Sequence, residues 1–92
     1  MTTATEIKRL FAAIETAEAA YDEALEALEA DAENESLEAA WDEAYRILWN
    51  TEKAFAVALE SFTFGFVSEK MARRMLTIKR DELAGLVHRL AA

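Results

Sequence analysis

The fold is decided by residues 10–45, which read LFAAIETAEAAYDEALEALEADAENESLEAAWDEAY. Ile14 and Tyr21 lie seven residues apart in the first half, and Trp41 begins a similar apolar series in the second. Apolar residues at this period predict two amphipathic helices. Residues 31–36 interrupt the period, so a short turn joins the two helices and makes them antiparallel.

The rest of the chain adds one more helical segment. Helices are predicted at about residues 4–31, 36–63 and 68–90, with Gly65 as the left-handed residue that ends the second. The predicted N-caps are Thr3 or Thr5, Asn34 or Ser36, and Ser68. The fold class is therefore all-α: one domain, residues 1–92, folded as a three-helix up-down-up bundle with a long N-terminal helical hairpin.

The composition restricts the chemistry. The 92 residues include no cysteine, so neither a disulfide nor a thiolate metal site stabilises the fold. The N-terminal residues lack the apolar run of a signal peptide, and no segment approaches the length of a membrane span. We therefore expect a cytoplasmic protein. Its net charge of −8 disfavours direct binding of nucleic acid or membrane through the bulk of its surface.

Catalytic residues are scarce. His88 is the only histidine and falls outside the apolar arc of its helix, which favours an ordinary surface imidazole. A helical di-iron site needs a histidine on each of two helices. Glu15 and Glu18 match the first half of a magnesium-binding pyrophosphohydrolase motif, Glu-x-x-Glu, but the second half, Glu-x-x-Asp, is missing. We expect no catalytic residue, no metal ligand and no cofactor.

Acidic residues are concentrated in residues 10–45, which hold twelve Asp and Glu side chains and no Lys or Arg. One flank of the first helix carries five of these acids at helical spacing: Glu15, Glu18, Asp22, Glu26 and Glu29. Acidic runs are commonly just solvated surface. Here, however, pairs such as Asp22–Glu26 place like charges four residues apart, which destabilises a helix. Because this repulsion lowers helix stability, we interpret the acidic flank as a surface selected for binding a partner. Trp49 lies away from the apolar series that begins at Trp41. We therefore predict that Trp49 is partly exposed and contacts the partner that the acidic flank binds.

The third predicted helix carries apolar residues over about 200° of its circumference, wider than a surface helix needs. It either packs between the other two helices or forms an interface with a second chain. In the second case Met71, Met75 and Leu86 mediate self-association, and the protein is a homodimer.

Part of the third predicted helix resembles a segment of known proteins. The tract Ala72-Arg-Arg-Met75, followed by Lys79-Arg-Asp-Glu-Leu83 and Leu86, is similar to the C-terminal segment of short phage and prophage proteins. The chain also resembles small helical anti-CRISPR proteins in length and acidity. The resemblance implies a mobile-element setting. It covers about fifteen residues and no functional motif, so it assigns no site residue.

Two functions from different classes are consistent with these features. The first is a non-enzymatic interaction protein whose acidic flank binds a basic surface of a larger protein, for example as a phage-encoded inhibitor of a host defence complex. Carboxylates one helical turn apart have about the spacing of phosphates in a nucleic-acid strand, so such a protein can act as a nucleic-acid mimic. The alternative is a self-associating structural or adaptor protein.

Overall fold

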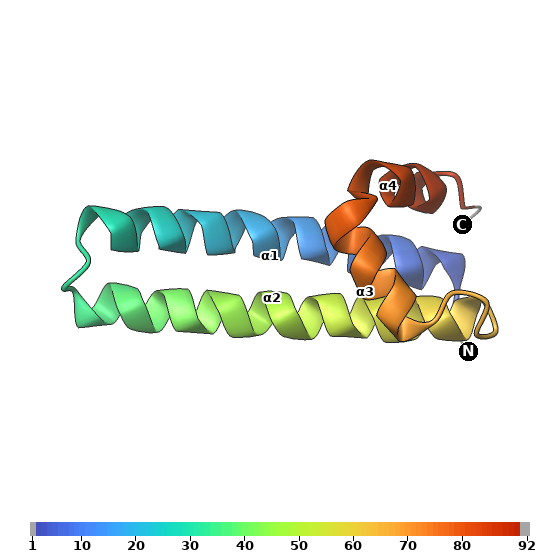
Figure 1. Ribbon diagram of the computed structural model, residues 1–92, viewed down its shortest axis with the longest axis horizontal. Coiled ribbons are helices and arrows are strands. Elements are labelled where there is room, and N and C mark those ends of the chain that lie inside the picture. The colour runs from blue at the N-terminus through green and yellow to red at the C-terminus, as the bar shows by residue number, and fades with distance from the viewer. Residues whose placement is uncertain (1, 91–92) are drawn as a thin grey trace.

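The computed structural model describes residues 2–90. Their regular secondary structure is entirely α-helical. The helices are α1 (Ala4–Ala30), α2 (Glu35–Phe62), α3 (Glu69–Ile78) and α4 (Arg80–His88). Figure 1 shows α1 and α2 as a long antiparallel hairpin, with α3 crossing it near one end and α4 beside α1. The described chain is elongated, measuring 46 × 22 × 19 Å.

Side-chain caps begin three of the helices. The Thr3 hydroxyl accepts a hydrogen bond from the Glu6 N–H, and the Asn34 side-chain oxygen accepts from the N–H groups of Ser36 and Leu37. Ser68 caps α3 by accepting from the Met71 N–H at 3.1 Å. Each cap satisfies N–H groups that have no partner inside the helix. The structure thus selects Thr3 and Asn34 from the predicted alternatives and confirms Ser68.

The predicted third helix is two helices, so the three-helix up-down-up topology is not confirmed. The chain leaves the helical conformation at Lys79, where φ is −126° and ψ is 43°. This break explains the wide apolar arc, because a helical wheel assumes one continuous axis. With the axis redirected, α3 packs its buried Ala72 and Leu76 against α2, and α4 turns its buried Leu83 and Val87 towards α1.

The hydrophobic core occupies only the end of the hairpin where all four helices meet. Its ten clustered residues come from every helix: Ile7, Phe11, Ile14, Phe55, Ala56, Leu59, Ala72, Leu76, Leu83 and Val87. Beyond Ala17 in α1 and before Phe55 in α2, no side chain is buried. We call this uncovered part of the hairpin, residues 18–48, the arm, and the other end the base.

The C-terminal end of α2 has an unusual backbone. The N–H of Gly65 donates to the Glu60 carbonyl and that of Phe64 to the Ser61 carbonyl, the two bonds of a Schellman motif. Gly65 has φ +83°, which confirms the predicted left-handed glycine. Phe64 also has a positive φ of 54°, at the position that the motif usually gives to glycine. A bulky residue in this region costs about 1 kcal/mol or more.

Candidate functional site

The arm presents most of the protein's acidic side chains to solvent. Of the predicted flank, Asp22, Glu26 and Glu29 lie on the arm and are exposed, and Glu15, just before the arm, is exposed as well. The fifth member, Glu18, is half-buried because Arg80 at the start of α4 draws it into an ion pair. The structure therefore separates the predicted flank into four exposed carboxylates and one that takes part in an internal contact.

Few of these carboxylates are neutralised within the protein. Of the twelve acids in residues 10–45, Glu18 pairs with Arg80 and Glu43 with Arg46, and among residues 2–90 the other ten form no ion pair. The Arg46 side chain donates two hydrogen bonds to Glu43 and thereby lowers the pKa of that carboxyl. The arm is consequently a strongly negative surface, because only two of its carboxylates are paired with a base within residues 2–90.

An aromatic cluster lies between the acidic side chains of the arm. The rings of Tyr21, Trp41 and Tyr45 pack in a triangle with centroids 6.1–6.2 Å apart. Tyr21 and Trp41 belong to the apolar series of the two predicted helices, yet both are only half-buried, and Tyr45 is exposed. The reason is that two helices alone cannot enclose them. Aromatic side chains with a free face are common at protein interfaces.

Trp41 also leaves a polar atom without a partner. Its indole Nε1 is buried and has no hydrogen-bond acceptor among residues 2–90. An unsatisfied buried N–H costs stability. Spacing along the chain cannot reveal this unpaired N–H, because the position of Trp41 fits a fully satisfied core residue equally well.

Trp49 is partly exposed, at 42%, as predicted. Its ring is covered in part by cationic side chains. The Arg73 guanidinium of α3 lies 4.8 Å from the ring centroid and the Lys53 ammonium lies 5.5 Å from it. The Arg73 contact joins α3 to α2, whereas Lys53 and Trp49 both belong to α2. Trp49 therefore has a structural contact that sequence spacing could not reveal, and only part of its ring is available to a partner.

A charged cluster joins the arm to the base. Glu18 of α1 and Glu52 of α2 lie near two arginines, Arg73 of α3 and Arg80 of α4. Burial and the neighbouring Glu18 carboxylate raise the pKa of Glu52, while the two arginines oppose that shift. The four side chains come from the four helices, so the cluster connects all of them.

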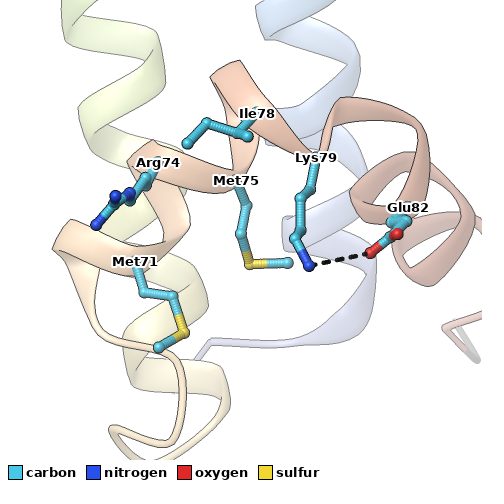
Figure 2. A pocket seen from close by; sticks show the side chains of 6 residues that line it. All are labelled: Met71, Arg74, Met75, Ile78, Lys79 and Glu82. Atoms are coloured by element: carbon cyan, nitrogen blue, oxygen red, sulfur yellow. Dashed lines mark ion pairs between the residues drawn. The ribbon is translucent and has the colours of Figure 1, made fainter.

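The residues predicted for self-association line two grooves that share Met75. Met71 and Leu86 are half-exposed and Met75 is half-buried. Met71 and Met75 line a groove of about 350 Å³ along α3 and the start of α4, drawn in Figure 2. Leu86 lies in a second groove, where Met75 again contributes, together with Phe62 and Leu90.

Comparison with known proteins gives no match, whether among family models, curated proteins or solved structures. Within residues 2–90, no group of three or more Asp, Glu or His side chains is arranged to hold a metal ion. None of the four helices combines the length and hydropathy required to cross a membrane.

Proposed function

We propose that this chain is a non-enzymatic interaction protein whose arm binds a basic surface on a larger protein and blocks or modulates that protein. The observation that carries the proposal is the set of ten acidic side chains in residues 10–45 that form no ion pair within residues 2–90. Such uncompensated charge lowers helix stability and is accounted for by a partner that supplies the missing cations.

The position of the arm supports the same proposal. It projects beyond the helices of the base, as Figure 1 shows, so a groove or channel on a partner can accept it from several sides. Asp22, Glu26 and Glu29 lie three or four residues apart on one exposed flank. Their spacing of about one helical turn is close to that of phosphates along a strand. A nucleic-acid-binding protein is therefore a suitable target, with the arm acting as a mimic.

Charge reversal on one flank tests the proposal. The variant Asp22→Lys/Glu26→Lys/Glu29→Lys removes the proposed contact. The matched variant Glu23→Lys/Asp31→Lys/Glu33→Lys makes the same net charge change elsewhere on the arm. The immobilised chain and both variants are used to capture proteins from a cell lysate at low salt, and the captured proteins are identified by mass spectrometry.

We expect the chain to retain proteins with basic surfaces that elute with salt, the flank variant to lose them, and the matched variant to retain most of them. Circular dichroism must show equal helix content in all three. Capture of the same proteins by the flank variant would exclude this surface as the contact.

A self-associating adaptor is the second candidate. The observation that favours it is the exposure of apolar side chains on the base, including Met71 and Leu86. Light scattering at about 50 mM and 500 mM salt separates the two candidates. Apolar association persists or strengthens at high salt, whereas binding through the arm weakens. A monomer at both salt concentrations favours the acidic interaction protein.

A further inference from the structure

The loop after α2 exposes two phenylalanine side chains almost completely. Phe64 is 98% exposed and Phe66 is 88% exposed, more than any other large apolar side chain described. They flank Gly65 at the base, at the opposite end of the hairpin from the turn of the arm (Figure 1). Single exposed apolar residues are ordinary, but two almost fully exposed phenyl rings in one short loop are not explained by folding.

The loop is held in a defined shape despite this exposure. In addition to the two bonds of the Schellman motif, the Thr63 hydroxyl accepts from the Val67 N–H at 3.0 Å and donates to the Leu59 carbonyl at 2.9 Å. The Glu60 carboxylate accepts from the Glu69 N–H at 2.8 Å, which connects the two ends of the loop. The phenyl rings are therefore presented by a preorganised backbone.

The backbone conformation of Phe64 indicates that its side chain has a role outside the fold. Its left-handed conformation disfavours a large side chain, and glycine is the residue usually found there. A ring that makes almost no contact within the protein cannot compensate for this strain. A contact with another molecule can.

The helix that follows the loop has a basic and apolar outer surface. Met71 is 50% exposed and Ile78 is 64% exposed, and the exposed bases Lys70 and Arg74 lie among them. Neither base forms an ion pair within residues 2–90. Figure 2 shows Met71, Arg74 and Ile78 on α3, with Lys79 turned towards Glu82 of α4, its ion-pair partner. Exposed bases among apolar side chains are typical of helices that lie on membrane surfaces.

Charge is divided between the two ends of the molecule. The arm, residues 18–48, contains eleven acids and one base, whereas the remaining residues contain seven acids and nine bases. The net charge of −8 thus averages a negative arm and a positive base. Because charges separated by more than about 10 Å are largely screened at physiological salt, the base interacts with a surface according to its own sign.

We propose that the Phe64–Phe66 loop and the outer surface of α3 bind an anionic phospholipid membrane. The two phenyl rings enter the interface between headgroups and acyl chains, and Lys70 and Arg74 contact lipid phosphates. A bilayer accepts two projecting rings without a shaped pocket, and its negative charge complements the bases. The arm, repelled by the same lipids, points away from the membrane. This inference does not depend on what the arm binds.

Vesicle binding by the full chain tests the proposal. The protein is mixed with sedimentable vesicles of phosphatidylcholine alone, or containing about a third phosphatidylglycerol, and the bound fraction gives a partition coefficient. We expect binding to the anionic vesicles that exceeds binding to neutral ones by tenfold or more and decreases with salt. Phe64→Ser/Phe66→Ser and Lys70→Glu/Arg74→Glu are each expected to reduce it by about tenfold or more.

Two controls separate binding from folding. Ile47→Ser/Val57→Ser removes two exposed apolar side chains of the hairpin and is expected to leave the partition coefficient unchanged. Phe64→Asn replaces the strained residue with one that tolerates positive φ, so it should melt at the same or a higher temperature and yet bind more weakly. This opposite response of stability and binding is not expected of a purely structural residue.

Several outcomes would overturn the proposal. They are absence of binding to anionic vesicles, equal binding to neutral vesicles, and undiminished binding by the Phe64→Ser/Phe66→Ser variant. A dimer in light scattering that dissociates in this variant, without lipid binding by the parent chain, would instead assign the rings to a second copy of the chain.

Discussion

Arg80, the first residue of α4, forms a two-pronged ion pair with Glu18 of α1, with Nη1 donating to Oε2 at 3.0 Å. Its guanidinium also lies 5.1 Å from the centroid of the Phe11 ring. The pair therefore connects the point where the predicted third helix breaks to the helix on which α4 packs. It also marks the boundary between the base and the arm.

Removing this contact should loosen α4. We expect Arg80→Ala to lower the free energy of unfolding by about 1–2 kcal/mol, because a half-exposed ion pair and a cation–π contact are both lost. A double-mutant cycle with Glu18→Gln, measured by urea denaturation, should give a coupling energy of about 0.5–1 kcal/mol. Strictly additive effects would show that the pair contributes no stability of its own.

The Glu52 carboxyl should make stability depend on pH. Its pKa is raised in the folded protein, so the folded state holds the proton more tightly than the unfolded state. This contribution is fully present below the pKa of the unfolded state and is lost as the pH rises through the folded pKa. Glu52→Gln should therefore stabilise the protein at pH 7 by a fraction of 1 kcal/mol, since solvent screens a partly buried group, and by less at pH 4.

Thermal denaturation of the parent chain and the Glu52→Gln variant between pH 4 and pH 7 measures this difference. The exposed Glu23→Gln serves as the control for removing one carboxylate from an acidic chain. An increase in melting temperature for Glu52→Gln that is equal at both pH values would contradict the assignment.

Replacing Trp41 should show that its indole nitrogen contributes no stability. Trp41→Phe keeps an aromatic ring in the cluster and removes the buried N–H that has no acceptor. We expect a change within about 0.5 kcal/mol. Trp41→Ala should cost about 1–3 kcal/mol, less than a fully buried tryptophan, since Trp41 is only half-buried. Chemical denaturation followed by circular dichroism compares the two variants. If Trp41→Phe lost as much stability as Trp41→Ala, the indole N–H would have a stabilising partner.

The acidic flank should oppose folding. Glu26→Lys removes the repulsion between Glu26 and Asp22 one turn earlier and replaces it with an attraction. We expect the helix to gain about 0.5–1 kcal/mol, and less at 500 mM salt than at 50 mM. Melting temperatures at both salt concentrations test this. A destabilised variant would mean that the Glu26 carboxylate has a stabilising partner within the protein. The argument that a binding partner supplies the missing positive charge would then fail.

The sequence predicted the hairpin well, because its signals are local. The caps Thr3, Asn34 and Ser68 act as predicted, and the left-handed conformation of Gly65 is confirmed. Hydrophobic periodicity and capping depend on neighbours within a turn or two, so they can be recognised without a structure.

The features that the sequence did not reveal depend on contacts between distant residues. No glycine or proline marks the break at Lys79, and the ion pair of Arg80 with Glu18 spans 62 positions of the chain. The exposure of Tyr45 follows from the absence of a third helix over the arm, which periodicity cannot show. Phe64 in a left-handed conformation contradicts residue preference, and only coordinates can identify such a position.

Because the core lies entirely at the base, the length of the arm is free to change independently of the fold. Deleting one heptad from each helix of the arm would keep the facing apolar stripes in register and leave all ten clustered core residues in place. Homologous chains could therefore differ in reach by steps of about 10 Å while sharing one base. In evolutionary terms, the molecule separates the part that must remain constant from the part that sets how far its charge extends.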